Sequence, residues 1–241
     1  MSFAVIECIT FDQENYRDEA HSHAHGQILL QRFGTTVFST ADGERVMTPG
    51  RVCWIPPNFV HGFYSPSRME GVSIFVSADE SRAMPHRISI FRANEFLDAL
   101  IHKMVDRKND ASKIQHLWWV MEDELCSAVP DELYLPAPQS EKLREMTDFL
   151  AANPAENLPV SYWAKRLHMA ERTLIRRFRA ETGMTIVQWR QHARVLAAIK
   201  LLTAGESVTQ AALAAGYESL SAFITVFKQV TGELPSQFIR R

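Results

Sequence analysis

Hydrophobic and polar positions alternate along the first ninety residues, in short runs separated by turn residues. The runs are rich in β-branched and aromatic side chains and cover residues 27–33, 35–39, 51–55 and 71–76. Turn residues stand between them at Asp42-Gly43, Pro49-Gly50 and Pro56-Pro57-Asn58. Runs of this length and spacing are typical of antiparallel strands. The pattern predicts a small antiparallel β-barrel or sandwich.

Between residues 93 and 129 the hydrophobic period changes from two residues to about 3.6 residues. Apolar stripes occupy 96–105 and 114–125, on either side of the polar segment 106–112. The stripes predict two antiparallel helices that close onto the barrel. Residues 117–121 are apolar nearly all round, so the side that faces away from the barrel needs a partner. That partner is either a second copy of the chain or another part of the same chain.

Three prolines mark the boundary between two domains. Pro130, Pro136 and Pro138 break any helix, and no hydrophobic period crosses them. We therefore predict a linker here, with a first domain at 1–135 and a second domain at 136–241. The second domain has helical periodicity in 141–152 and 186–203. In the latter, Arg190 and Arg194 lie four residues apart and could contact phosphate.

The second domain contains an internal repeat. Segments 158–185 and 207–234 both have the pattern of a short helix, a tight turn and a longer amphipathic helix. Each longer helix ends at a glycine, Gly183 in the first copy and Gly232 in the second. Phe178 and Arg179 recur 49 positions later as Phe227 and Lys228. The repeat predicts two helix-turn-helix units joined by one helix.

The outer face of each longer helix is the candidate DNA-reading surface. In the first copy Leu174 and Phe178 face inward, which leaves Arg172, Ile175, Arg176 and Arg179 outside. Arginine bonds bidentately to guanine or phosphate, and isoleucine can touch a thymine methyl group. The second copy presents Ser221, Ile224, Thr225 and Lys228, so we expect it to read bases more weakly. The alternative is that both faces are ordinary solvated surfaces, but the duplication favours DNA binding.

Residues 158–241 resemble the DNA-binding domain of AraC/XylS-type transcription regulators. The resemblance is carried by RTLIRRFRAETGMT and by GYESLSAFITVFKQVTGELPSQFIRR. It implies that both longer helices enter successive major grooves, and it assigns DNA contacts to Arg172, Ile175 and Arg176 and to Leu220, Ser221 and Thr225. The chain departs from the family pattern at Ala170, where serine is usual at the start of the first reading helix. It departs again at Thr225, where arginine is frequent, which puts a strong contact there in doubt.

Histidines are the informative residues of the first domain. His21, His23, His25 and Gln27 alternate along the chain, so an extended strand would place them on one face. HSHAHGQ and GRVCWIPPNFVH resemble the two short motifs of the cupin barrel, which implies that His21, His23, Gln27 and His61 line the barrel mouth. Imidazoles in this pattern could hold a divalent metal such as Zn, Ni, Fe or Mn. They could equally be hydrogen-bonding residues of an effector pocket.

Aromatic side chains near these strands are candidates for the rest of such a pocket or for plain core. They are Phe38, Trp54, Phe59, Phe63, Tyr64 and Phe75.

Composition and charge narrow the picture further. The 241 residues are 46% hydrophobic and 22% charged, with no long apolar segment, so we expect a cytoplasmic protein without a membrane span. The three cysteines, Cys8, Cys53 and Cys126, are too scattered for a disulfide framework, and we expect reduced, mostly buried thiols. Residues 1–135 carry 12 basic and 19 acidic side chains, a net charge of −7, whereas 136–241 carry 14 and 9, a net charge of +5. Only the second domain is therefore expected to touch a polyanion.

Together these observations predict an α+β protein that acts as a one-component transcription regulator. The partners implied are double-stranded DNA, a small-molecule effector, a second copy of the chain and, for an activator, RNA polymerase. No cofactor is assigned beyond the divalent metal considered above. Two alternatives stay open: a cupin enzyme, such as a metal-dependent oxygenase or isomerase, and a DNA-binding protein whose first domain only dimerises. The regulator needs no catalysis.

Overall fold

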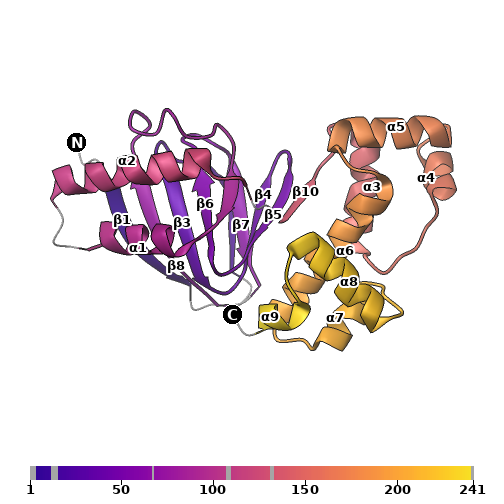
Figure 1. Cartoon of the computed structure of the whole chain (residues 1–241). Coiled ribbons are helices and arrows are strands. Elements are labelled where there is room, and N and C mark those ends of the chain that lie inside the picture. Colours follow the sequence, from indigo (N-terminus) through magenta and orange to yellow (C-terminus); the bar gives the residue numbers. More distant parts are fainter. Residues whose placement is uncertain (1–3, 12–15, 67, 107–109, 131–132, 240–241) are drawn as a thin grey trace. The chain divides into compact units, whose positions relative to one another are not determined.

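The computed structural model describes residues 4–11, 16–66, 68–106, 110–130 and 133–239, and Figure 1 shows it from end to end. The chain forms two compact units. The first comprises Met1–Phe38 and Met47–Glu132, and the second comprises Ser39–Val46 and Leu133–Arg241. Strands dominate the first unit and helices the second, which confirms the predicted α+β class. No described helix is long and apolar enough to cross a membrane.

Among the described residues, ten strands form two five-stranded sheets. In the first sheet the order is β1 (Ala4–Phe11), β8 (Met69–Val76), β3 (Gly26–Phe33), β6 (Arg51–Ile55) and β9 (Ser89–Arg92). In the second it is β10 (Leu133–Pro136), β5 (Gly43–Met47), β4 (Thr36–Thr40), β7 (His61–Ser65) and β2 (Tyr16–His21). Neighbours in the first sheet pair antiparallel. The four strands expected from the alternating pattern are therefore confirmed.

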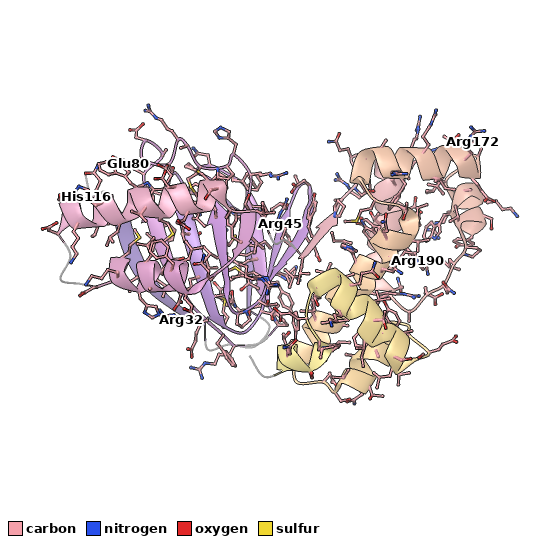
Figure 2. All side chains as sticks on the ribbon, viewed as in Figure 1. Arg32, Arg45, Glu80, His116, Arg172 and Arg190 are labelled. Atoms are coloured by element: carbon pink, nitrogen blue, oxygen red, sulfur yellow. The ribbon has the colours of Figure 1, made fainter. Side chains whose placement is uncertain are left out.

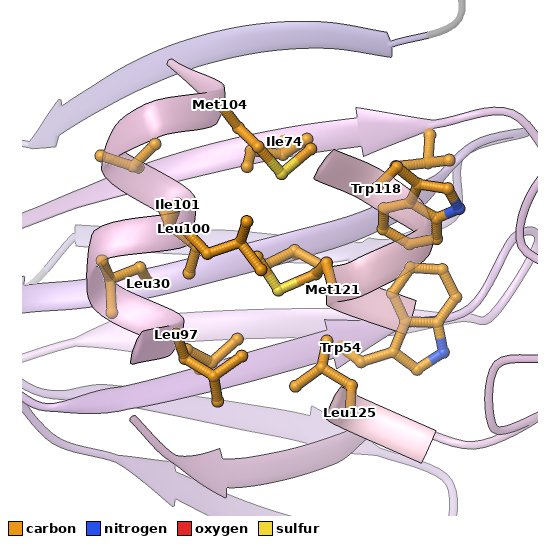
Figure 3. Close-up of a cluster of buried hydrophobic side chains, with 14 of the residues drawn as sticks. Leu30, Trp54, Ile74, Leu97, Leu100, Ile101, Met104, Trp118, Met121 and Leu125 are labelled. Carbon is orange, nitrogen blue, oxygen red and sulfur yellow. The ribbon is translucent and has the colours of Figure 1, made fainter. Parts of the chain in front are cut away.

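Alternation along the strands of the first sheet divides the interior into two clusters. In β6, Val52 and Trp54 point to one side of the sheet, and Cys53 and Ile55 point to the other. The Trp54 side is covered by α1 (Glu95–Met104) and α2 (Ala111–Ser127), as Figure 1 shows. The close-up in Figure 3 shows the apolar side chains of both helices meeting the sheet there, namely Leu97, Leu100, Ile101, Met104, Trp118, Met121 and Leu125. The two predicted helices are thus confirmed.

One glycine makes room for this cluster. A Cβ atom on Gly26 would lie 2.1 Å from the Trp54 ring, whose centroid lies 6.3 Å from that of Trp118. The thiols are only partly as expected, because Cys53 is buried whereas Cys126 is exposed, and neither forms a disulfide with a described residue. The side chain of Cys8, and residues 107–109 of the expected polar segment between the helices, lie outside the described residues.

The expected linker is not a simple loop. Within it, Leu133–Pro136 forms strand β10, which pairs antiparallel with β5. Leu133 and Leu135 lie at alternate positions, and both are buried. Burial of these two side chains favours a strand here, although the neighbouring prolines predict a loop. The Ser39–Val46 hairpin thereby joins the second unit, where Asp42 O accepts hydrogen bonds from Ala137 N (2.8 Å) and Tyr134 Oη (2.7 Å).

Seven helices make up the rest of the second unit as far as it is described: α3 (Glu141–Ala152), α4 (Val160–Arg166), α5 (Glu171–Thr182), α6 (Ile186–Thr203), α7 (Val208–Ala214), α8 (Leu220–Thr231) and α9 (Pro235–Ile239). Gly183 and Gly232 end α5 and α8 in the left-handed conformation, with φ of 73° and 76°. Ser207 opens α7 with a capping box, and Thr185 opens α6 in the same way. Both predicted helix-turn-helix units are confirmed.

Candidate functional site

The outer face of α5 is the more basic of the two candidate reading surfaces. Leu174 and Phe178 are buried, and the Phe178 ring packs edge-on against Trp189 of α6, with centroids 6.2 Å apart. The opposite side of α5 presents Arg172, Ile175, Arg176 and Arg179 together along one surface. Ile175 is 47% exposed, and Figure 2 shows Arg172 on the outer side of the helix.

The arginines of this face are not used up within the described part of the chain. None of Arg172, Arg176 or Arg179 has an acidic or hydrogen-bonding partner there, whereas Arg166 of α4 bonds to Glu145 at 2.8 Å. Guanidinium groups that need not leave an internal partner can neutralise phosphate or bond to base edges. The α5 face therefore has the chemistry of a major-groove reader.

The outer face of α8 is arranged differently. Phe223 and Phe227 are buried with ring centroids 5.4 Å apart, and this leaves Leu220, Ser221, Thr225 and Lys228 exposed. The hydroxyl groups already have partners, since Ser221 Oγ lies 2.8 Å from Ser219 Oγ and Thr225 Oγ1 donates to Ser221 O at 2.9 Å. These internal bonds add a reason, absent from the sequence argument, for α8 to read bases more weakly than α5.

Arg190 and Arg194 both bond to main-chain carbonyls of the segment between α3 and α4. Arg190 donates to Glu156 O (2.6 Å), to Leu158 O (3.2 Å) and to Asn157 Oδ1. Arg194 Nε donates to Pro154 O at 2.8 Å. Burial, with the nearby charge of Arg194, lowers the pKa of Arg190. The expected phosphate contacts stay a prediction, because these bonds hold both terminal nitrogens of Arg190 but only Nε of Arg194.

The first unit contains a cavity of about 180 Å³ between its sheets. Six strands supply its lining. One end is polar, with Asp18, His21, His23, Gln27 and His61. The remaining wall is mainly apolar, with Leu29, Thr36, Phe38, Ile55, Phe63, Met69 and Phe75. The structure thus brings together the four residues that the cupin resemblance implied, with His21 in β2, Gln27 in β3, His61 in β7 and His23 in the connection between β2 and β3. The expectation of one extended strand through His25 is wrong, because the strand is interrupted at 22–25 and His25 does not line the cavity.

Hydrogen bonds fix the orientation of the three imidazoles. In His21, His23 and His61 the Nδ1 atom lies 2.9, 2.5 and 2.9 Å from a main-chain carbonyl, those of Glu19, His25 and Phe59. A carbonyl only accepts, so Nδ1 carries the proton in each ring, and Nε2 of a neutral His21 or His61 ring remains an acceptor. His23 Nε2 is not a free acceptor, because it faces the side-chain oxygen of Gln27, which also only accepts. The side-chain amide of Gln27 bridges His23 Nε2 (3.1 Å) and Ser73 Oγ (2.6 Å).

Charge in the cavity is disfavoured at His61, which is 2% exposed. Burial lowers the pKa of His61, and the nearby rings of His21 and His23 lower it further. Its neutral form is therefore favoured in the folded chain. Among the described residues, no three His, Cys, Asp or Glu side chains are arranged to hold a metal ion, and the set offers no close carboxylate besides Asp18.

Three sequence-based assignments around the cavity need correction. Phe59 does not line it and packs against the apolar cluster that contains Cys53 and Ile55. Trp54 does not line the cavity, because its side chain lies on the side of the sheet that α1 and α2 cover. There Trp54 Nε1 donates to Pro85 O at 2.8 Å. Tyr64 is likewise outside the lining and lies under Arg17, 5.4 Å from the guanidinium carbon to the ring centroid. Leu29, Thr36 and Met69 were missed, although they share strand parity with Gln27, Phe38 and Phe75 and could have been found from it. Ile55 was also missed, because the candidate chosen in its strand, Trp54, has the opposite parity.

Comparison with known proteins agrees with both surfaces. The family model for the AraC-like ligand binding domain matches residues 3–128, more than half of the chain. The chain belongs to the AraC family of transcription regulators. The model for the helix-turn-helix domain matches residues 163–241. This AraC-family protein is therefore a DNA-binding regulator with a ligand-binding domain, not an enzyme.

Three relatives show the extent of the likeness. The HTH-type transcriptional regulator NimR of Escherichia coli is 28% identical over 241 residues, 99% of this chain and 88% of NimR. The transcriptional activator RhaR of Salmonella dublin is 32% identical over 106 residues, 43% of this chain and 38% of RhaR. The DNA-binding domain of AdpA, solved with a target DNA, is 33% identical over 42% of this chain and 92% of that domain, with a TM-score of 0.39.

Proposed function

We propose that this AraC-family regulator acts as a homodimer, reads DNA with the outer faces of α5 and α8, and changes its DNA binding when a small molecule enters the cavity of the first unit. The observation that carries the DNA-reading proposal is the row of arginines on α5 without partners in the described chain. On this proposal Arg172, Arg176 and Arg179 supply base and phosphate contacts, Ile175 supplies an apolar contact, and α8 adds Leu220, Ser221, Thr225 and Lys228.

The cavity supports an effector with an apolar body and one polar head. Apolar side chains form most of its wall, and at the other end burial lowers the pKa of His61 and favours its neutral ring. A hydrogen-bond donor on the effector would satisfy Nε2 of His61, because a buried acceptor without a partner costs about 1–3 kcal/mol. We propose this role for His21, His23, Gln27 and His61 in place of a resident metal.

The dimer proposal is supported by the outward side of α2. Trp119 and Val120 are 47% and 41% exposed, on the helix whose other side covers the first sheet. A second copy packed there would remove these side chains from water. Sedimentation of wild type against Trp119→Arg tests it: we expect a dimer and a monomer, and a monomeric wild type would contradict the proposal.

A route for the effector signal is supported by strand β4. Thr36 and Phe38 line the cavity, and the hairpin that continues from them, Ser39–Val46, pairs with β10 in the second unit. In that unit Glu44 bonds to Lys200 of α6 at 3.2 Å, and Trp189 Nε1 of the same helix donates to Pro136 O at 2.7 Å. Effector binding at β4 would thus act on the helix that joins the two reading units.

The DNA-reading proposal is tested by the division of the chain. We expect a fragment from about Gln139 to Arg241 to shift a duplex selected from a random library by the full chain, and a fragment 1–135 to leave it unshifted. Binding by the N-terminal fragment alone would contradict the proposal. A further proposal is that the bound regulator recruits RNA polymerase and activates transcription; the relative RhaR is a transcriptional activator. Transcription in vitro from the selected site tests this proposal.

The effector proposal is tested with a panel of small apolar acids, alcohols and heteroaromatic compounds. We expect at least one to raise the melting temperature of the wild type, and His61→Leu to abolish the shift. His25→Leu is the matched control, because His25 belongs to the same sequence run but does not line the cavity. About one metal ion per chain in untreated wild-type protein would overturn the proposal in favour of a metal site.

A further inference from the structure

The two helix-turn-helix units have equivalent turns, and each turn contains one residue in the left-handed backbone conformation. This residue is His168 in the first turn and Gly216 in the second, with φ of 52° and 81°. A side chain is therefore compatible with this turn, and backbone conformation alone does not require glycine in the second. A Cβ atom on Gly216 would lie 2.6 Å from Cα of Ala155. Close approach of the segment between α3 and α4 to the second turn excludes any larger residue.

Arg194 of α6 joins the same two segments. Its Nε donates to Pro154 O at 2.8 Å, next to Ala155. Its guanidinium carbon lies 5.6 Å from the ring centroid of Tyr217, the residue after Gly216. This is within the range of cation–π attraction. One side chain thus holds both the segment that leads into α4 and the turn that leads into α8.

Contacts continue from this junction into the second reading helix. The Tyr217 ring packs against Phe223, with centroids 5.3 Å apart, and Phe223 is a fully buried residue of α8. Arg190 lies one helical turn before Arg194 and bonds to the same segment between α3 and α4, at Glu156 and Leu158. In the described part of the chain, however, Arg190 forms no hydrogen bond or ring contact with the second helix-turn-helix. It is a natural matched control.

We propose that Arg194, together with the contact between Ala155 and Gly216, sets the spacing and angle between α5 and α8, and so determines how far apart the two DNA segments that they read must lie. Arg194 is a positioning residue, since it acts through Pro154 and Tyr217 rather than on DNA. The inference rests on the proposed reading by both helices. One base pair of B-DNA adds about 3.4 Å and about 34–36° of rotation, so a rigid pair of helices accepts one spacing and a loosened pair accepts several.

The test measures affinity against spacing. A duplex is selected from a random library with the full-length wild type, and footprinting locates the two DNA segments that the protein protects. One base pair is then inserted or deleted between these two segments. We expect the wild type to lose about tenfold or more with either change, comparable to a mismatched base pair. Arg194→Met is expected to bind the changed duplexes within about threefold of the original, and Arg190→Met to retain the steep wild-type profile.

A second variant keeps the test decisive if Arg194→Met does not fold. Tyr217→Leu removes the other end of the cation–π contact and should also flatten the profile. A steep profile in the folded Arg194→Met protein, or in Tyr217→Leu when Arg194→Met is unfolded, would overturn the inference. So would a profile flattened equally by Arg190→Met. Failure of the underlying proposal is separable, because Arg176→Ala would then leave affinity for the selected duplex unchanged.

Discussion

The start of α5 offers a quantitative test of the local energetics, because Ala170 stands where a helix requires an acceptor. Ala170 has extended backbone angles, φ −70° and ψ 143°, and its side chain makes no capping bond. The equivalent Ser219 of α8 accepts from Ala222 N at 3.4 Å, and Ser207 caps α7 in the same way. A serine at position 170 already has the required backbone geometry, so its hydroxyl can accept from Thr173 N without rearrangement.

Capping bonds of this kind stabilise proteins by roughly 0.5–2 kcal/mol, typically about 1 kcal/mol. We expect Ala170→Ser to lie at the lower half of that range, about 0.5–1 kcal/mol, because the site is exposed to water, which already solvates the amide. For a unit of this size the change corresponds to a rise in Tm of about 2–6 °C. A melting curve of the whole chain combines both compact units, so hydrogen exchange at the Thr173 amide is the most specific measurement.

The matched control is Ser219→Ala, which makes the reverse change at the equivalent position of the second helix-turn-helix. It should lower the free energy of unfolding, by less than about 1 kcal/mol because the bond it removes is long. Unchanged protection of Thr173 and unchanged Tm in Ala170→Ser, alongside a measurable loss in Ser219→Ala, would show that another group already satisfies the first turn of α5. The argument from capping would then be refuted for this helix.

Three further outcomes follow from the structure. Arg176→Ala should cost about 1–3 kcal/mol in binding to the selected duplex, more than Thr225→Ala, whose hydroxyl is already bonded; the reverse order in a mobility-shift titration would contradict the assignment of α5 as the stronger reader. Gly26→Ala should destabilise the first unit by at least about 1 kcal/mol, because the new Cβ meets the Trp54 ring, whereas Gly50→Ala, with open space around it, tests the separate cost of positive φ; equal denaturation midpoints for wild type and Gly26→Ala would disprove the close contact. Burial lowers the pKa of His192, although a hydrogen bond with the Tyr134 backbone raises it. The contribution of the neutral His192 ring to stability is therefore present above the unfolded pKa near 6.5 and is lost as pH falls through the folded pKa. His192→Gln should reduce the loss of unfolding free energy between about pH 7 and 5, and an unchanged dependence of that free energy on pH would contradict the argument.

The sequence by itself determined the elements and the sides they present. Runs of β-branched and other apolar residues at 27–33 and 51–55 indicated which strands form, and the helical spacing of Leu174 and Phe178 indicated which side of α5 remains exposed. Gly183 and Gly232 determined where both reading helices end. These features depend on near neighbours in the chain, and one sequence contains all the information that they need.

Tertiary structure decided which of several compatible partners each side chain takes. The sequence of β6 does not specify which side of the sheet Trp54 faces. Only the pairing of β6 with β3 and β9 placed Trp54 beneath α1 and α2 instead of in the cavity. Arg194 has the same charge as Arg176, yet it is occupied by Pro154 and Tyr217, which lie 40 and 23 positions away in the chain. Leu133 and Leu135 pair with β5 across some ninety residues. Such contacts join distant segments, and a local pattern cannot specify them because their energy depends on where the whole chain brings each partner.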